Sequence, residues 1–235
     1  MQPLYNGKAK QLLPTDTPQT VRIFFKDTVT AGDGKKRATI PGKGALAAQI
    51  SSKLFELLKD SVPSHYVKQL DAQSFEALKV QIIPLEVVVR TRAAGSLVKR
   101  LGLERGQPLQ PPLVEFFYKS DALHDPLICP THIRALGIAT DAELAQITEY
   151  ALRATALLHE YFARLNLILV DIKFEFGKTP DGQILLADEI SPDTMRLWDA
   201  RTLESLDKDV FREEKGDLLT VYREVARRMT ESGSP

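Results

Sequence analysis

Apolar residues recur at three- and four-residue intervals in two long stretches of the chain, and this spacing predicts two amphipathic helices. The first helix is expected over residues 44–59. The second is expected over about residues 141–165, where Thr140 and Glu143 form a capping box at its start. A third helical pattern covers about residues 215–229, close to the end of the chain.

Shorter apolar runs predict strands in both halves of the chain. Asn6-Gly7 marks a hairpin turn near the N-terminus. Further strands are expected at residues 21–26, 65–70, 80–91, 167–176 and 183–190. Because these strands are mixed with segregated helices, we expect an α+β fold with two lobes.

Prolines mark the expected interruptions of these strands. Pro84 lies inside the third strand, which favours a break or a connection between lobes near residues 82–86. We therefore expect a mainly β lobe over residues 1–85 and an α+β lobe over residues 86–235. A stiff loop is expected at Pro108, Pro111 and Pro112.

Composition and charge exclude several classes of protein. The chain has 31 Lys and Arg against 31 Asp and Glu, a formal net charge of zero, so we expect no nucleic-acid partner. Its apolar runs are far shorter than the roughly 20 residues that span a bilayer, and we expect no membrane partner. No signal peptide is visible at the N-terminus. Cys129 is the only cysteine, which excludes an internal disulfide and fits a cytoplasmic location.

The most informative stretch is the strand around residue 173. Side chains of a strand alternate between its two faces, so Asp171, Lys173 and Glu175 share one face. The opposite face is apolar and is expected to point into the core. Taken alone, the charged face could equally be a solvated surface with a Lys–carboxylate pair.

The following hairpin suggests a metal site. A turn centred on Asp181-Gly182 would place Glu175 directly opposite Asp188, with Cβ atoms about 5 Å apart. Two carboxylates so close repel each other unless a cation or a proton lies between them. Oxygen ligands favour magnesium, and Lys173 would hold an anionic ligand beside the ion. A one-residue slip in register would remove this arrangement.

Arg90 and Ser96 form a candidate anion site between a strand and a short helix. Ser96 is expected to cap the helix, which leaves backbone N–H groups free beside the Arg90 guanidinium. Asp193 and Arg196 are expected on a loop that leaves the strand over residues 183–190. Both pairs also have an ordinary explanation, as a capped helix and as a turn with a surface arginine.

Lys8 and Lys10 form a third candidate site beyond the hairpin turn at Gly7. They would share one strand face, and the glycine would let a nucleotide phosphate approach the backbone. Two lysines on a hairpin are also common as solubilising residues.

Taken together, these segments resemble the SAICAR synthetase (phosphoribosylaminoimidazole-succinocarboxamide synthase) family. They lie in the family's order over nearly the whole chain. The segments that carry the resemblance are Tyr5-Asn6-Gly7-Lys8-Ala9-Lys10, Lys43-Gly44, Pro84 to Arg90 with Gly95-Ser96-Leu97, Lys119 to Ala122, Asp125-Pro126-Leu127, Leu169 to Gly177, Asp188 to Thr194, Arg196 to Asp199, and Asp207-Lys208-Asp209 with Phe211-Arg212.

The resemblance implies a ligase that joins L-aspartate to the carboxylate of carboxyaminoimidazole ribonucleotide in de novo purine biosynthesis. The products are SAICAR, ADP and phosphate, the intermediate is an acyl phosphate, and the cofactors are ATP and Mg²⁺. It also implies a fold distantly like protein kinases, in which ATP lies in the cleft between a nucleotide-binding N-terminal lobe and a substrate-binding C-terminal lobe. A homodimer is the family's usual bacterial form.

The resemblance also assigns roles to residues. Lys173, Glu175 and Asp188 would be catalytic, and the two carboxylates would hold the metal. ATP would lie at Lys8, Ala9, Lys10, Ile82 and Lys119. The ribonucleotide would lie at Arg90, Ser96, Asp171, Asp193 and Arg196.

Two other classes of protein fit parts of the sequence. A kinase would share the nucleotide site, but the chain has no His-Arg-Asp or Asp-Phe-Gly signature. A nucleotide-binding regulatory module would keep Lys8 and Lys10, but it would not need Lys173, Glu175 and Asp188 on one surface.

Overall fold

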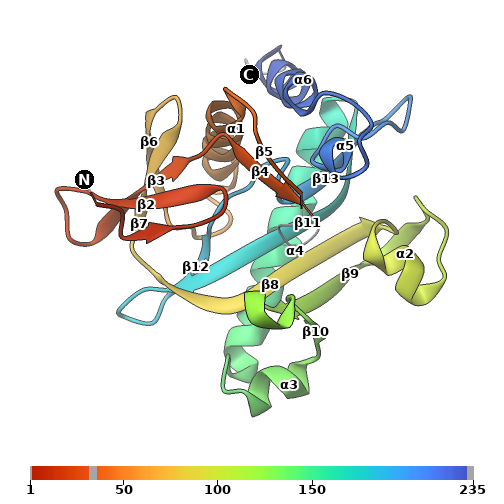
Figure 1. The fold of residues 1–235 in the computed structure, drawn as a ribbon. Coiled ribbons are helices and arrows are strands. Elements are labelled where there is room, and N and C mark those ends of the chain that lie inside the picture. The colour runs from red at the N-terminus through yellow and green to blue at the C-terminus, as the bar shows by residue number, and fades with distance from the viewer. Residues whose placement is uncertain (1, 32–35, 232–235) are drawn as a thin grey trace.

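The smaller of the two main antiparallel sheets comes from the N-terminal part of the chain. A computed structural model of the protein describes residues 2–31 and 36–231. The spatial order of this five-stranded sheet is β1 (Tyr5–Asn6), β2 (Lys10–Pro14), β3 (Thr20–Phe25), β7 (Ser74–Leu78) and β6 (Tyr66–Asp71). Helix α1 (Lys43–Leu58) packs against it, and a ribbon of β4 (Thr28–Ala31) and β5 (Lys36–Thr39) stands beside it (Figure 1).

The larger sheet lies at the centre of the molecule. Its main order is β10 (Leu127–Ile128), β9 (Pro108–Tyr118), β8 (Gln81–Arg92), β11 (Leu167–Lys178) and β12 (Ile184–Ala187). A sixth strand, β13 (Met195–Asp199), pairs with the first part of β11, on the edge that β12 uses further along. The long strand β11 therefore contacts β8 on one edge and two short strands on the other.

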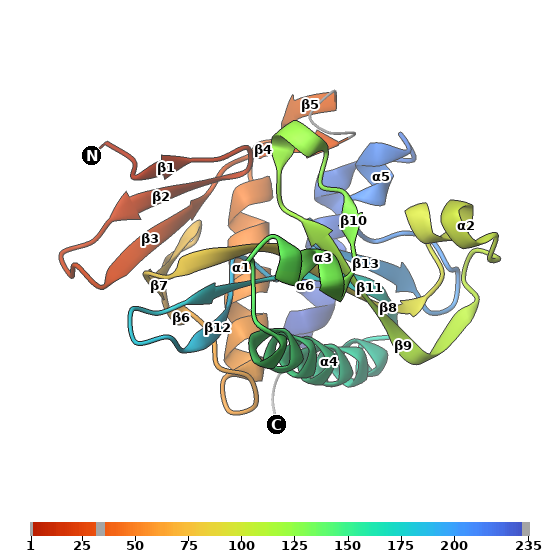
Figure 2. The same cartoon turned by 90° about the horizontal axis from the view of Figure 1, so that it is seen from below.

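Helices connect and cover these sheets. Helix α4 (Asp141–Arg164) runs along one face of the larger sheet, and Figure 2 shows it from below. The remaining helical elements are α2 (Ser96–Leu101), the 3₁₀ turn η1 (Asp121–Leu123), α3 (Pro130–Ala135), α5 (Asp209–Arg212) and α6 (Leu218–Glu231). Among the described residues, no helix has the length and apolar character needed to cross a membrane.

The predicted amphipathic patterns explain how α4 and β11 pack. The capping box is present: Thr140 Oγ1 accepts from the Glu143 amide at 3.3 Å, and Glu143 accepts from the Thr140 amide at 2.8 Å. The apolar stripe of α4 is buried together with the apolar face of β11, at Leu144, Ile147, Ala151, Ala154, Leu158, Phe162, Ile172, Phe174 and Phe176. The charged face of β11 therefore points away from α4, as predicted.

Two segments that were predicted as loops form strands. The prolines of β9 are compatible with a strand because β10 reaches only Phe116 and Phe117, so that end of β9 has a free edge. Residues 195–199 form β13 because they pair with β11, and the alternation of so short a segment is a weak signal.

The predicted break at Pro84 is also absent, since β8 continues through it. The pairing of β8 with β11 shifts there, from Glu86 opposite Glu175 to Ile82 opposite Gly177, so the proline lies in an irregular part of the ladder. In the chain, the smaller sheet ends with β7 and the larger sheet begins with β8. The division into lobes over residues 1–85 and 86–235 stays a prediction.

The hairpin between β11 and β12 has a register one residue away from the predicted one. Glu175 lies opposite Ala187, and Lys178 lies opposite Ile184. Gly182 adopts a φ of 87°, and its amide donates to Thr179 O at 2.9 Å, so three residues rather than two form the turn tip. The prediction that Glu175 faces Asp188 directly is therefore wrong.

The outer edge of β13 is covered by the segment that follows it. The Leu206 amide donates to Leu197 O at 2.7 Å, and the Leu197 amide donates to Asp207 Oδ2 at 2.9 Å. The Asp207 side chain is fully buried. Burial, and secondarily the neighbouring charge of Asp209, raises the pKa of Asp207 to about 7.

The buried Asp207 makes the stability of the fold depend on pH. Because its folded pKa lies above the ordinary value of 3.8, the folded state retains a proton that the unfolded state has lost. The contribution of this carboxyl to stability is fully present below about pH 4 and is lost as the pH rises through about 7, by about 1.4 kcal/mol per pH unit. Urea unfolding should be measured for the unmodified protein and for Asp207→Asn between pH 5 and 7.5. As the pH rises, the free energy of unfolding of the unmodified protein should fall relative to that of the variant. A constant difference between the two proteins would contradict the raised pKa.

Candidate functional site

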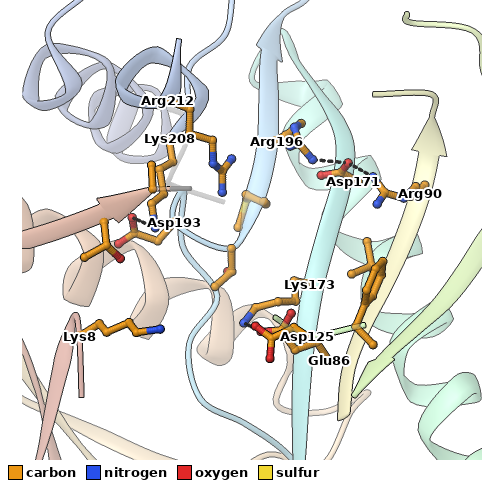
Figure 3. Close-up of a pocket in the computed structure, with 16 residues that line it drawn as sticks. Lys8, Glu86, Arg90, Asp125, Asp171, Lys173, Asp193, Arg196, Lys208 and Arg212 are labelled. Carbon is orange, nitrogen blue, oxygen red and sulfur yellow. Dashed lines mark hydrogen bonds and ion pairs between the residues drawn. The ribbon is translucent and has the colours of Figure 1, made fainter. Parts of the chain in front are cut away.

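A cavity of about 490 Å³ lies over the charged face of β11. Figure 3 shows its walls: side chains of β8, β11 and β13 form one side, and the β1–β2 turn and the segment before and within α5 lie across from them. Six residues that the sequence singled out line it, namely Lys8, Arg90, Asp171, Lys173, Asp193 and Arg196. The two ends of the cavity carry different arrangements of charged side chains.

One end of the cavity carries two arginines bridged by a carboxylate. Arg90, Asp171 and Arg196 are directly opposite one another on the neighbouring strands β8, β11 and β13. Asp171 Oδ2 accepts from Arg90 Nη1 at 2.7 Å and from Arg196 Nη1 at 2.8 Å, as the dashed lines in Figure 3 show. Residues 106 positions apart in the sequence thus meet at one site, and Arg196 reaches it from a strand, not from the predicted loop.

Carboxylates also hold the outer sides of both arginines. Glu115 on β9 accepts from Arg90 Nε at 2.7 Å, and Asp209 on α5 accepts from Arg196 Nε at 2.7 Å. Burial alone would lower the pKa of Arg196, but the charges of Asp171 and Asp209 outweigh it and raise that pKa. Both guanidinium groups are therefore charged and fixed in orientation, which suits recognition of a phosphate.

Ala94 and Gly95, rather than Ser96, are the residues of this loop that lie against the arginine pair, and the Ala94 carbonyl accepts from Arg90 Nη1 at 3.4 Å. A Cβ atom on Gly95 would lie 2.6 Å from Arg196 Nη2, so the missing side chain makes room for the guanidinium. Gly95 is also the N-cap of α2, with a φ of 56°. Ser96 is the first residue of the helix and is exposed, which corrects its predicted role as the cap.

The other end of the cavity carries a lysine between two carboxylates. Lys173 Nζ lies 2.6 Å from Glu86 Oε1 and 2.9 Å from Glu175 Oε1. Glu86 is the residue directly opposite Glu175 on β8. The second oxygen of Glu175 pairs with Lys119. Burial alone would lower the pKa of Lys173, but the charges of Glu175 and Glu86 outweigh it, so the pKa is raised and the side chain is a cation.

Asp188 belongs to the same charged cluster, although it does not pair with Glu175. It follows β12 with a φ of 61° and binds Lys10, whose Nζ also lies 2.8 Å from Glu189 Oε1. Burial alone would raise the pKa of Asp188, but the charges of Lys10, Lys173 and Lys119 outweigh it and lower that pKa. The sequence predicted that Glu175 and Asp188 would repel each other. In the structure, lysine side chains pair with both carboxylates instead.

Asp193 forms a third charged group on the wall of the cavity. It lies in a turn, as predicted, and pairs with Lys43 at the buried start of α1. Tyr222 Oη donates to Asp193 at 3.0 Å, and Lys208 Nζ lies 3.7 Å away. Burial would raise the pKa of Asp193, but Lys43 and Lys208 outweigh it and lower that pKa.

The remaining predicted residues lie beside the cavity or away from its wall. The lysine–carboxylate cluster next to it contains Lys10, Lys119, Glu175 and Asp188. Lys8 reaches across to Asp121 of η1, with 2.7 Å between Nζ and Oδ1. The other three predicted residues, Ala9, Ile82 and Ser96, neither line the cavity nor belong to this cluster.

The sequence interpretation gave no role to several charged residues of the site. Glu86, Lys208 and Arg212 line the cavity, and Lys43 holds Asp193. Glu86 had a usable signal, because strand alternation places it on the same face of β8 as Arg90. The other three were part of the segments that carry the family resemblance, but no local pattern of charge or spacing distinguished them from surface residues.

Comparisons with known proteins agree with this fold. A family model described as SAICAR synthetase matches residues 3–229. Relatives named phosphoribosylaminoimidazole-succinocarboxamide synthase include one from Exiguobacterium sibiricum, 49% identical over 99% of this chain and 100% of its own length. Another, from Lysinibacillus sphaericus, is 50% identical over 96% of both chains.

Solved structures extend the agreement to three dimensions. A SAICAR synthetase (Type-2) in complex with ADP has a TM-score of 0.93 at 48% identity over 98% of both chains. The phosphoribosylaminoimidazole-succinocarboxamide synthase from Ehrlichia chaffeensis has a TM-score of 0.95 at 41% identity, over 97% of this chain and 98% of its own. These matches confirm the α+β fold, and the chain belongs to the SAICAR synthetase family.

Proposed function

We propose that the cavity binds carboxyaminoimidazole ribonucleotide and L-aspartate and that the lysine–carboxylate cluster beside it binds ATP. As a member of its family, the chain is an ATP-dependent ligase of de novo purine biosynthesis. The observation that carries the residue assignment is the placement of Lys173 on β11 and of one arginine on each of the two strands beside it. Arg90 and Arg196 meet at Asp171, and Lys173 follows two residues later on the same face.

The arginine pair is suited to the 5′-phosphate of the ribonucleotide. Guanidinium groups bind phosphate oxygens in a bidentate manner, and these two are already oriented by Asp171, Glu115 and Asp209. Asp193 would accept from ribose hydroxyls on the neighbouring wall. Ser96 lies on the adjacent α2 and would reach the phosphate only through its exposed side chain.

The nucleotide is proposed to lie between the two sheets, next to Lys10 and Lys119. One of the similar solved structures is a complex with ADP, which supports a nucleotide site in this fold. Lys8, Lys10 and Lys119 would neutralise its phosphates, and Ala9 and Ile82 would contact the rest of the molecule. Lys10 is held among carboxylates that keep it charged, since they raise its pKa although burial would lower it.

The chemistry needs charge neutralisation more than a protein nucleophile. A carboxylate oxygen of the ribonucleotide would attack the γ-phosphorus of ATP, and ADP would leave with the electrons of the broken P–O bond. The amine of aspartate would then attack the acyl carbon, form the C–N bond, lose a proton and expel phosphate. Lys173 has a raised pKa and is a cation, so it would stabilise the negative oxygens and would not act as a base.

The two carboxylates beside the cavity, Glu175 and Asp188, are ligands of the kind that magnesium prefers. Among residues 2–31 and 36–231, no three His, Cys, Asp or Glu side chains are grouped to hold a metal ion. Magnesium commonly takes one or two protein carboxylates and completes its shell with water and substrate phosphates. Glu175 and Asp188 would supply those two carboxylates, and the ion would neutralise phosphate charge.

The family also suggests where and in what form the enzyme acts. We infer a cytoplasmic location, where ATP and free nucleotides are available, and a homodimer as in the usual bacterial form. Equilibrium sedimentation of the purified chain tests the second inference, and a single species with the mass of one chain would contradict it.

A coupled assay of ADP release tests the proposed reaction directly. With ATP, Mg²⁺ and carboxyaminoimidazole ribonucleotide, release of ADP should require L-aspartate for sustained turnover. A kinase would release ADP without aspartate, and a regulatory module would release none. Formation of a product containing aspartate, measured by mass spectrometry, identifies the ligase.

Replacing Arg90 by Lys should weaken binding of the ribonucleotide selectively. Lysine keeps the charge, but its single ammonium cannot bridge Glu115, Asp171 and a phosphate as the guanidinium does. We expect the KM for the ribonucleotide to rise about 10- to 100-fold, which corresponds to about 1.4–3 kcal/mol. The KM for ATP should stay within about twofold.

A matched control for this change is Arg105→Lys. Arg105 stacks on Trp198 with 4.1 Å between its guanidinium carbon and the ring centre, and it does not line the cavity. Its replacement should leave both KM values unchanged. An equal rise in the KM for ATP and for the ribonucleotide in Arg90→Lys would contradict the phosphate assignment.

Replacing Asp188 by Asn should remove most turnover and also lower stability. The lysines around Asp188 lower its pKa, so its charge stabilises the fold at neutral pH and losing it costs on the order of 1–3 kcal/mol. If Glu175 and Asp188 repelled each other without lysines between them, removing one charge would instead stabilise the fold. Magnesium titrations of activity and the Tm measure the two effects.

Glu189→Gln is the control for the metal assignment, because Glu189 contacts the same Lys10 but is outside the proposed metal pair. It should lower the Tm and retain magnesium-dependent turnover. Near-normal magnesium-dependent activity of Asp188→Asn would show that Asp188 does not serve the metal.

A further inference from the structure

Arg196 is anchored by two carboxylates of different rigidity. Asp171 belongs to the central strand β11, which is paired on both edges. Asp209 lies in α5, a helix of four residues in the segment that follows β13. The orientation of the Arg196 guanidinium therefore depends on how firmly this short segment is held against the strand.

Asp207 is the group that holds the segment. Its Oδ1 accepts from the Asp209 amide at 2.7 Å, and its Oδ2 accepts from the Leu197 amide and from Ser205 Oγ, both at 2.9 Å. Leu197 is the neighbour of Arg196 on β13, and Asp209 is the residue whose carboxylate binds Arg196. One side chain thus ties together the strand that carries the arginine and the helix that carries its outer anchor.

We propose that Asp207 is a positioning residue for the phosphate of the ribonucleotide. It does not line the cavity and touches no proposed ligand. It acts through Asp209 and Arg196, whose Nε–Oδ2 contact at 2.7 Å fixes the guanidinium toward the cavity. The inference rests on the proposed function, since it assigns Arg196 to that phosphate.

The hydrogen bonds of Asp207 explain why a carboxyl group stands at this buried position. The carboxyl is fully buried, and among the neighbouring charges the negative charge of Asp209 raises its pKa by more than the positive charge of Arg196 lowers it. Its raised pKa shows that ionising the buried carboxyl is unfavourable. What a carboxylate supplies is two acceptor oxygens for three donors, two of them backbone amides that have to be satisfied in the interior.

An amide cannot replace this carboxylate. Asn has one acceptor oxygen, so in either orientation its NH₂ group meets a backbone N–H, of Leu197 or of Asp209. The change keeps the size of the side chain and breaks one of the two ties. It should displace Asp209 and loosen Arg196 without altering the nucleotide cluster around Lys10.

The test is the kinetic profile of Asp207→Asn in the full-length enzyme. We expect the KM for carboxyaminoimidazole ribonucleotide to rise about tenfold or more, with the KM values for ATP and L-aspartate within about twofold. Calorimetric binding of the ribonucleotide should show the same weakening. A purely structural role would reduce the amount of active enzyme, and hence the apparent kcat, but would leave all three KM values unchanged.

Asp199→Asn is the matched control. Asp199 also lies on β13 and accepts from two backbone amides, Arg201 at 2.9 Å and Thr202 at 3.0 Å, but it binds Arg228 and not the arginine pair. It should lower the Tm without changing the KM for the ribonucleotide. The same rise in both variants would overturn the proposal, because it would reflect general loosening of the strand.

Ser205→Ala provides a milder version that preserves the carboxylate. It removes one of the three donors to Asp207, and we expect a two- to fivefold rise in the KM for the ribonucleotide. If Asp207→Asn does not fold, this variant decides, and an unchanged KM overturns the proposal. If the unmodified enzyme shows no ribonucleotide-dependent turnover, the proposed function itself fails, which is a distinct outcome.

Discussion

Two arginines cannot lie side by side in a largely buried site unless carboxylates neutralise them, and this constraint organises the cavity. The charges alternate across the sheet, from Glu115 on β9 through Arg90 on β8, Asp171 on β11 and Arg196 on β13 to Asp209 on α5. Each step crosses to the adjacent strand or segment. The order of strands in the larger sheet and the identity of these residues are therefore matched to each other.

The lysine–carboxylate cluster follows the same rule with the charges reversed. Glu86 and Glu175 lie opposite each other, and Lys173 lies between them. Lys10 does the same for Asp188 and Glu189. Forming such buried ion pairs contributes little net stability, because desolvation offsets the attraction, although removing one partner of a formed pair is destabilising. Their consequence is chemical: Lys10 and Lys173 remain cations and Asp188 remains an anion at neutral pH, although burial alone would favour their neutral forms.

Much of the fold was predictable because its signals are local. The capping box at Thr140 and Glu143 and the apolar stripe of α4 depend only on residues within a few turns of each other. The alternation over residues 171–176 likewise separated the core face of β11 from its charged face. Strand β13 and the proline-containing end of β9 were missed, because they are strands only through pairing with β11 and β8.

For the site, the sequence by itself determined which residue types are present and which face of a segment carries them, since these properties follow from helix and strand periodicity. It also placed Arg90, Asp171, Lys173, Asp193 and Arg196 among the residues of interest. Only the tertiary structure decided which of them meet. Because the turn tip has three residues, Glu175 lies opposite Ala187 and not opposite Asp188. Pairing on the other edge of β11 places Glu86 opposite Glu175. Contacts across strands depend on turn geometry and on partners far away in the chain, and a shift of one residue changes every neighbour.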